Sequence, residues 1–338
     1  MITSLLMLFA VAAAICAALI VALQPLLKRY ALARPNARSS HRVPTPQGGG
    51  IAVIASTIVV SVLGIVLLHY ANFDPKAVAL IFGATVYIAL VGVIDDIRTI
   101  GVAPRLVLQA VAVALILAAL PADLRIVAEL PWSAERALLL LGGVWFVNLV
   151  NFMDGIDWMT AAEVIPVTAG LAILGLIGEF PPQGMLVAAA LGGAMIGFAP
   201  FNKPVARLFL GDVGSLPIGL LLCWLLVVLA GNGHLAAAIL LPLYYACDAT
   251  ITLVLRIARQ EPFWQAHRRH FYQRALDGGL SVTTIVSRIF IVNIILVVLA
   301  ISTAVVPGRT VSYLALACGA ALVGWLLRSF VRSPPTGS

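Results

Sequence analysis

Residues 4–26 read SLLMLFAVAAAICAALIVALQPL, an apolar stretch without a single charged side chain. As a helix, such a stretch is long enough to cross ~30 Å of hydrocarbon. Comparable stretches follow one another along all 338 residues, of which 62% are hydrophobic and 10% are charged. Soluble domains are about 45–50% apolar and about 25% charged. Because every backbone polar group in a bilayer must be satisfied internally, the sequence predicts an all-α integral membrane protein.

The apolar stretches predict about eleven transmembrane helices in a single polytopic membrane domain, residues 1–338. The four cysteines all lie within these stretches and lack metal-site spacing, which is typical of small core residues. The expected spans are 4–26, 49–69, 77–94, 106–120, 136–151, 161–178, 184–200, 214–231, 235–256, 284–305 and 311–327.

The basic residues predict the orientation of the chain in the membrane. No Lys or Arg precedes the first span, whereas Lys28 and Arg29 follow it, so we expect a retained helix with its N-terminus outside. Alternation from there places 17 of the 21 Lys and Arg residues on the cytoplasmic side, together with the C-terminus. We therefore expect a multi-pass protein of a bacterial inner membrane, and no nucleic-acid partner. The cytoplasmic loops that carry unusual residues are near 27–48, 95–105, 152–160, 201–213 and 256–283.

The stretch VGVIDD, residues 91–96, ends a predicted span with two adjacent carboxylates, Asp95 and Asp96. Such a pair at a membrane boundary is costly unless a cation neutralises it. The alternative is a solvated helix end, with Arg98 and Arg105 as local partners.

The stretch NLVNFMDGIDWMT, residues 148–160, carries amides and carboxylates three positions apart. On a continued helix they would share one face and suit a hydrated metal ion and a polar ligand, although Gly155 favours a break. An Asn- and Asp-rich turn is the alternative. The residues are Asn148, Asn151, Asp154 and Asp157.

The stretch PFNKPVARLFLGDVGSLPIG, residues 200–219, places Asp212 between two glycines just before another span. The glycines allow a close backbone approach, and the following helix N-terminus would favour an anion. A capped loop is the alternative, because Asp and Ser are common N-caps. Asn202 adds a further polar group.

The stretch RIARQEPFWQAHRRHFYQRAL, residues 256–276, combines His267 and His270 with several arginines and aromatic residues. No third His or Cys accompanies the pair, which argues against zinc. The segment suits either anionic lipid or a diphosphate. By contrast, we expect Asp248, inside a predicted span, to be a paired structural residue.

Together these loops suit a divalent cation, a phosphorylated water-soluble ligand and a lipid. A transporter, the rival class, would need polar residues near the bilayer midplane and usually broken helices there.

Five segments in this order resemble the polyprenyl-phosphate N-acetylhexosamine-1-phosphate transferase family, of glycosyltransferase family 4 type. The resemblance runs from about residue 34 to 276. It implies transfer of a sugar 1-phosphate from a UDP-N-acetyl sugar to undecaprenyl phosphate, with release of UMP and a requirement for Mg²⁺. It leaves open Mn²⁺ as a substitute and a homodimer. The segments are HRVPTPQGG, VGVIDD, NFMDGID, FNKPVARLFLGDVGS and AHRRHFYQR.

The resemblance also implies roles for individual residues. Asp95 and Asp96 match an aspartate pair proposed as base or as magnesium and lipid-phosphate site, and Asp212 matches a magnesium ligand. Asn151, Asp154 and Asp157 match the nucleotide and metal loop, and Asn202 a polar position of the same cleft. His267 and His270 match a motif associated with the diphosphate and sugar. Further binding candidates are His41, Arg105 and Arg268.

Two departures concern the sugar. Trp158 replaces a glycine of the family pattern, and the motif HRRHFYQR lacks the triple histidine of the peptidoglycan branch. We hypothesise that Trp158 and the 256–276 loop select the sugar, and we favour the O-antigen-initiating branch. The alternatives are phospho-MurNAc-pentapeptide transfer, a non-catalytic lipid-linked-sugar transporter and a CDP-alcohol phosphatidyltransferase.

Overall fold

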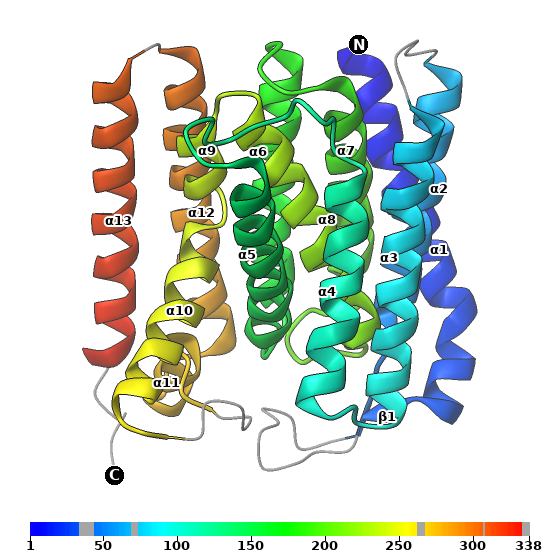
Figure 1. The fold of residues 1–338 in the computed structure, drawn as a ribbon. Coiled ribbons are helices and arrows are strands. Elements are labelled where there is room, and N and C mark those ends of the chain that lie inside the picture. Colours follow the sequence, from blue (N-terminus) through cyan, green and yellow to red (C-terminus); the bar gives the residue numbers. More distant parts are fainter. Residues whose placement is uncertain (34–43, 69–73, 262–267, 307, 333–338) are drawn as a thin grey trace.

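The computed structural model describes residues 1–33, 44–68, 74–261, 268–306 and 308–332. Long helices lie side by side in one bundle, with the N-terminus at one end and the end of the last helix, α13, at the other (Figure 1). The elements are α1 Ile2–Tyr30, β1 Leu32–Ala33, β2 Thr45–Pro46, α2 Gly49–Leu67, α3 Pro75–Ile97, α4 Val102–Ala118, α5 Trp132–Met153, α6 Met159–Leu176, α7 Pro182–Phe198, α8 Asp212–Gly231, α9 Leu235–Leu240, α10 Leu243–Ala258, α11 Phe271–Asp277, α12 Val282–Val305 and α13 Arg309–Arg332.

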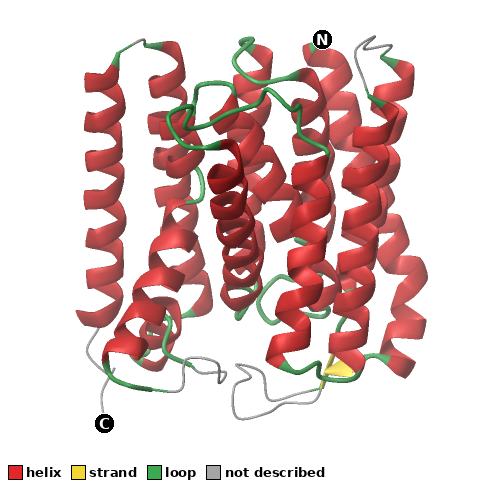
Figure 2. Ribbon diagram, viewed as in Figure 1, coloured by secondary structure: helices red, strands yellow, loops and turns green. Residues whose placement is uncertain are grey.

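The prediction of an all-α integral membrane protein is confirmed. Within the described residues, eight helices are long and apolar enough to cross a membrane, and the shorter α4 and α7 are apolar as well. The one small sheet pairs the two-residue strands β1 and β2 (Figure 2). The expected total of eleven crossings stays a prediction.

The prediction of one continuous helix over 235–256 is wrong. The chain forms α9 and α10 there, and the helix breaks at Leu241 and Pro242. Proline has no N–H to donate, and its ring clashes with the carbonyl four residues earlier, which explains the break. A broken helix is also a feature of transporters, but here the polar residues of the predicted site lie at the end of the bundle.

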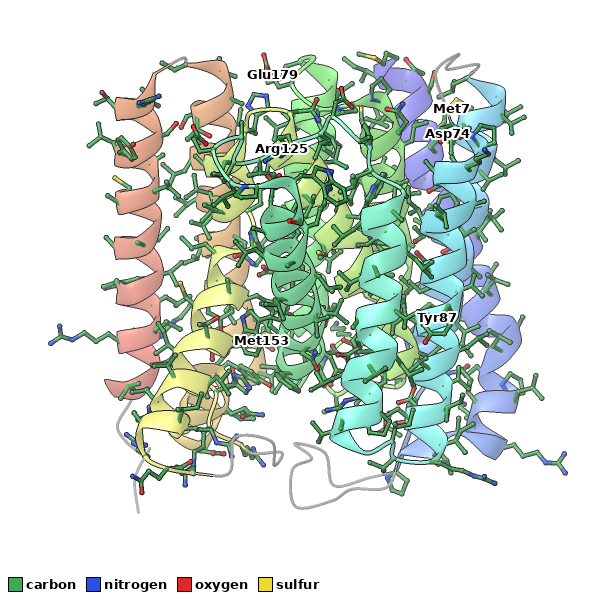
Figure 3. All side chains as sticks on the ribbon, viewed as in Figure 1. Met7, Asp74, Tyr87, Arg125, Met153 and Glu179 are labelled. Carbon is green, nitrogen blue, oxygen red and sulfur yellow. The ribbon has the colours of Figure 1, made fainter. Side chains whose placement is uncertain are left out.

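Successive long helices run in alternating directions, so the predicted cytoplasmic loops gather at one end of the bundle. The loops after α3, α5 and α7 and the helix α11 all lie at the end opposite the N-terminus (Figure 1). Figure 3 shows Asp74, Arg125 and Glu179 toward the N-terminal end. The candidate site therefore has to form at the other end.

The centre of the bundle is α8, which is buried along almost its whole length. Glycines let neighbouring helices reach its first turn. A Cβ on Gly50 of α2 would lie 2.2 Å from the Cα of Gly214, and a Cβ on Gly92 of α3 would lie 2.4 Å from the backbone oxygen of Asp212. The start of α8 is thus enclosed by α2 and α3.

The segment before α2 holds the loop before α8 in place through backbone hydrogen bonds. Phe209 N–H donates to the Pro46 carbonyl at 2.8 Å, and Gly49 N–H donates to the Phe209 carbonyl at 2.9 Å. Gly48, with φ of +105°, makes the turn into α2, a conformation that favours glycine. The Pro- and Gly-rich pattern at 44–50 therefore shapes the same region as Asp212.

Candidate active site

Four aspartates from separate parts of the chain meet around one cavity of about 210 Å³ at this end of the bundle. They come from the end of α3, the α5–α6 loop and the start of α8. Spacing along the sequence does not reveal that these aspartates are close in space, since Asp96 and Asp212 are 116 positions apart. The lining residues are Gln47, Asp96, Asn151, Asp154, Gly155, Ile156, Asp157, Asn202, Phe209, Leu210, Gly211 and Asp212.

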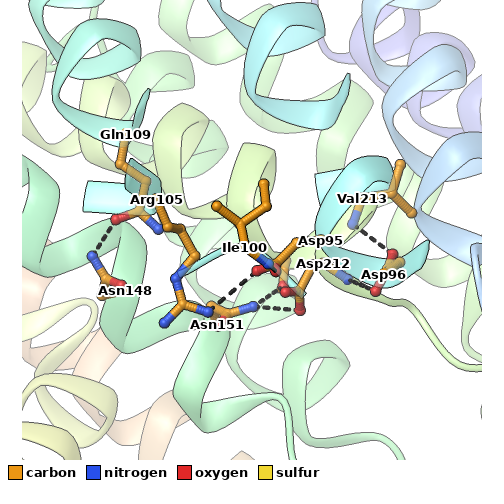
Figure 4. A network of polar contacts seen from close by, with 10 residues as sticks. Asp95, Asp96, Ile100, Arg105, Gln109, Asn148, Asn151, Asp212 and Val213 are labelled. Atoms are coloured by element: carbon orange, nitrogen blue, oxygen red, sulfur yellow. Dashed lines mark hydrogen bonds and ion pairs between the residues drawn. The ribbon is translucent and has the colours of Figure 1, made fainter. Parts of the chain in front are cut away.

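Asp96 caps the N-terminus of α8 from the neighbouring helix. Its two oxygens accept hydrogen bonds from the N–H groups of Asp212, at 3.0 Å, and Val213, at 3.1 Å (Figure 4). A carboxylate here is stabilised by the positive end of the helix dipole. The expected preference of this N-terminus for an anion agrees with the geometry, and the anion that it holds is the Asp96 carboxylate.

Asp212 faces the cavity and is held by α5. The Asn151 amide donates to its Oδ1 at 2.7 Å and to the Ser215 hydroxyl at 2.9 Å (Figure 4). Asn151 thus fixes the Asp212 carboxylate against the first turn of α8. The predicted grouping of Asn151, Asp154 and Asp212 in one site matches this geometry.

Asp95 lies beside Asp212 but does not line the cavity (Figure 4). Its oxygens accept hydrogen bonds from Ile100 N–H, at 2.6 Å, and from the Arg105 guanidinium, at 3.2 Å. Local pairing with Arg105 is the alternative that the sequence left open for the pair Asp95 and Asp96. Asp95 and Arg105 thus hold the end of α3, and their predicted catalytic and binding roles stay predictions.

The helix does not continue over 148–157, in agreement with the break that Gly155 favours, because α5 ends at Met153. Asn148 instead points to α4, where its amide donates to the Gln109 side chain. Asp154 and Asp157 belong to the following loop, yet both line the cavity.

Asp154 is half-buried and accepts a hydrogen bond from the Thr160 hydroxyl. The pKa of the Asp154 carboxyl is raised to about 6, mainly by burial and less by nearby Asp96 and Asp157, while the Thr160 hydrogen bond lowers it. The charge on Asp154 is therefore costly in this cavity, and a bound cation would offset that cost.

Asp157 and Asn202 connect the α5–α6 loop to the α7–α8 loop. Asp157 accepts from Ala206 N–H at 2.9 Å. The Asn202 Oδ1 accepts from Trp158 N–H at 2.7 Å, and its amide donates to the Leu208 carbonyl at 3.0 Å. Both residues are buried. They form one wall of the cavity and hold its two loops together.

Trp158 adopts a left-handed backbone conformation, with φ of +64°, which favours the glycine that the family resemblance implies at this position. Its indole N–H donates to the Ala199 carbonyl at 2.7 Å. Trp158 is not among the residues that line the cavity. This placement favours a packing role over the hypothesis that Trp158 selects the sugar.

His270 is buried at the start of α11, where its Nδ1 lies 3.1 Å from the Asp248 Oδ1. Asp248 also accepts from Phe271 N–H, at 3.0 Å, and from the Tyr244 hydroxyl, at 3.1 Å. Asp248 is therefore the paired structural residue that we expected. His270 does not line the cavity, so its predicted catalytic role stays a prediction.

Tyr272 links the junction between α10 and α11 to the acidic cavity. Its hydroxyl donates to the Phe152 carbonyl at 3.4 Å, and a Cβ on Gly155 would lie 2.0 Å from the same hydroxyl. Arg268, a predicted ligand, pairs with Asp277 at 3.1 Å. The candidates His41 and His267 lie outside the described residues.

The sequence patterns did not predict two residues of the site. Gln47 lines the cavity and donates to the Asp96 carbonyl at 3.2 Å, and Thr160 holds Asp154. Gln47 could have been predicted from the sequence, since it lies inside the HRVPTPQGG segment that resembles the family. Thr160 carries no comparable pattern.

The donor set suits a hard divalent cation such as Mg²⁺, which prefers oxygen ligands. Across the described ranges, however, no three His, Cys, Asp or Glu groups converge to hold an ion by themselves. Mg²⁺ usually keeps several waters and uses one or two carboxylates together with substrate phosphates. The cavity fits a cation of that kind, with Asp212 and Asp154 as its candidate protein ligands.

Fold and site together define a membrane protein with an acidic, oxygen-rich cavity at one end of a helical bundle. Residues 78–230 match the model of glycosyl transferase family 4. The chain is 25% identical to a probable undecaprenyl-phosphate N-acetylglucosaminyl 1-phosphate transferase of Bacillus subtilis, over 82% of this chain and 80% of that protein.

Two further relatives support the same assignment. The chain is 27% identical to a decaprenyl-phosphate N-acetylglucosaminephosphotransferase of Mycobacterium leprae, covering 77% of this chain and 74% of that protein. It is 32% identical to a phospho-N-acetylmuramoyl-pentapeptide-transferase of Trichormus variabilis, covering 63% and 62%. These similarities support the resemblance to the polyprenyl-phosphate hexosamine-1-phosphate transferase family that the sequence motifs carry.

Proposed function

We propose that this protein transfers an N-acetylhexosamine 1-phosphate from a UDP-sugar to undecaprenyl phosphate, releases UMP and so initiates a lipid-linked glycan of the cell envelope. The observation that carries the proposal is the cavity in which Asp96, Asp154, Asp157 and Asp212 meet at the end of a membrane-spanning bundle. The names of the relatives support the same reaction class. The active site faces the cytoplasm, where UDP-sugars are found.

Mg²⁺, when bound, would neutralise charge on the UDP-sugar diphosphate and favour in-line displacement at the β-phosphorus. The chain itself supplies position. Asn151 orients Asp212, the α8 N-terminus fixes Asp96, and Thr160 orients Asp154. The nucleophile, a lipid phosphate oxygen, is already largely anionic near neutral pH, so these residues act more through charge and orientation than through proton removal.

Phospho-MurNAc-pentapeptide transfer is the second candidate, favoured by the name of the Trichormus relative. It uses the same bond changes with a larger donor. The lack of the triple-histidine motif in HRRHFYQR favours the first candidate.

The test is UMP release by purified protein with undecaprenyl phosphate, Mg²⁺ and a panel of UDP-sugars that includes UDP-GlcNAc and UDP-MurNAc-pentapeptide. We expect turnover with at least one UDP-N-acetyl sugar and none after chelation of divalent cations. Asp123→Asn, an exposed change in the loop at the opposite end, is the matched control and should keep full activity. Folded protein that releases UMP from no donor would overturn the proposal.

A further inference from the structure

Tyr272 of α11 is fully buried, and its side chain reaches the segment from which two aspartates of the acidic cavity emerge. Its hydroxyl donates a hydrogen bond to the Phe152 carbonyl at 3.4 Å, across 120 positions of the sequence. Phe152 lies in the last turn of α5, directly before the loop that carries Asp154 and Asp157. Tyr272 therefore supports the α5–α6 loop without lining the cavity itself.

Gly155 lines the acidic cavity and packs directly against the same hydroxyl. A Cβ on Gly155 would lie 2.0 Å from the Tyr272 hydroxyl oxygen, and its next neighbours would be Cζ and Cε2 of the same ring, at 3.1 and 3.4 Å. Gly155 is not one of the glycines with a left-handed backbone, so backbone strain does not explain the residue. The close approach of Tyr272 requires glycine at this position.

Tyr272 is itself held in place by α10 and by the start of α11. Its N–H donates to the Asp248 Oδ2 at 3.3 Å, and its ring stacks on the His270 imidazole, with the centroids 5.7 Å apart and the planes at 18°. Asp248 is fully buried in α10 and also accepts from the Tyr244 hydroxyl at 3.1 Å. Because Tyr272 is anchored in this way, a conflict between its hydroxyl and position 155 has to be resolved by movement of the loop.

We infer that Tyr272 is a positioning residue for the transferase reaction: through the Phe152 carbonyl and Gly155, its hydroxyl sets the place of Asp154 and Asp157 in the cavity. A displacement of about 1 Å at a reacting site can cost about 10²-fold in rate, so a contact behind the loop is enough to control turnover. The kinetic part of this inference rests on the proposed function, whereas the contact can be tested without turnover.

The experiment is a double-mutant cycle on Gly155 and Tyr272 in the full-length protein. Gly155→Ala should lower kcat for UMP release about 10²-fold, because the methyl group and the hydroxyl cannot share one space and the loop has to shift by roughly 1 Å. Tyr272→Phe loses one hydrogen bond and should lower kcat about three- to tenfold. The double variant has room for the methyl group, so it should turn over at least about tenfold faster than Gly155→Ala.

The matched control is Tyr313→Phe, which removes the hydroxyl of an exposed tyrosine of α13 and should behave like the parent. A double variant as slow as Gly155→Ala would overturn the inference. So would a Tyr272→Phe protein with a lower thermal midpoint but the parent's kcat per folded molecule, which is the pattern of a purely structural residue.

Amide hydrogen exchange without substrate tests the contact independently of the reaction. Tyr272→Phe should exchange faster than the parent over residues 152–157, and Tyr313→Phe should exchange like the parent there. If the parent released UMP from no donor, the proposed function would fail, and hydrogen exchange would decide the inference alone. Unchanged exchange over 152–157 in Tyr272→Phe would then show that the hydroxyl does not hold the loop.

Discussion

The acidic cavity and the junction between α10 and α11 both contain carboxylates that are at least partly buried. The two regions differ in how many hydrogen-bond donors surround the carboxylate. Asp248 is fully buried, and hydroxyl groups, an imidazole nitrogen and two backbone N–H groups surround it. Asp212, by contrast, has the Asn151 amide as its donor within the described residues, and it lies beside Asp96. Asp212 is half-buried, and a carboxylate that is even partly buried without enough donors is costly. The comparison indicates that the protein itself satisfies the hydrogen bonding of Asp248. For Asp212, we propose that a ligand compensates the charge.

The largest effect that this comparison predicts is on turnover. Asp212→Asn should lower the rate of UMP release about 10²–10³-fold, because it removes charge stabilisation needed in the transition state. It should not lower the thermal midpoint in detergent, since it also removes repulsion from Asp96. Steady-state kinetics and a melting curve on the same preparation check both parts.

If Asp212→Asn strongly lowered the thermal midpoint as well as the rate, the comparison would fail, because Asp212 would then be a structural residue like Asp248. Asp123→Asn serves again as the carboxylate-to-amide control.

The second prediction reverses the pattern at the junction. Asp248→Asn should destabilise the protein by roughly 3 kcal/mol, because several buried donors lose their acceptor at once. We expect a lower thermal midpoint and less folded protein. The rate per folded molecule should fall far less than in Asp212→Asn. A normal melting curve combined with lost turnover would place Asp248 in the chemistry and contradict its structural role.

The sequence predicted the helices well because apolar length is a local property, and the helix ends agree within a few residues. It did not predict the break at Pro242, because a proline alone does not mark a break: Pro166 and Pro217 lie inside the continuous helices α6 and α8. It named Asp96, Asp154 and Asp212 as site residues from spacing and resemblance. It could not separate Asp95 from Asp96, because their roles differ only in which neighbour each side chain reaches, Arg105 or the start of α8.

The third prediction concerns Trp158, whose contacts are those of a packing residue. Trp158→Gly relieves the left-handed backbone strain but removes the indole and its hydrogen bond to the Ala199 carbonyl. We expect rates with all UDP-N-acetyl sugars to fall in parallel, by a few fold, while the relative rates stay the same. Competition between pairs of donors measures this directly. A changed preference among sugars would instead support the hypothesis that Trp158 selects the donor.

The smallest predicted effect sharpens the comparison with a third buried carboxyl group. Glu163 of α6 accepts from the Asn293 amide of α12 at 2.7 Å, and both residues are buried. The second oxygen of Glu163, Oε1, and the amide oxygen of Asn293, Oδ1, have no partner within the described residues. One proton on Glu163 would satisfy both oxygens by closing a ring of two hydrogen bonds, so we expect a neutral acid.

Glutamine can form the same ring, because its amide donates to the Asn293 oxygen while its own oxygen accepts. Glu163→Gln should therefore change stability by less than about 1 kcal/mol and leave turnover intact. Glu163→Ala leaves the Asn293 amide without its carboxyl partner and should cost about 1–3 kcal/mol. The two melting curves, compared with the parent, decide the point. If Glu163→Gln were as damaging as Glu163→Ala, Glu163 would have to be ionised, and an unidentified cation would then have to compensate its charge, as we propose for Asp212.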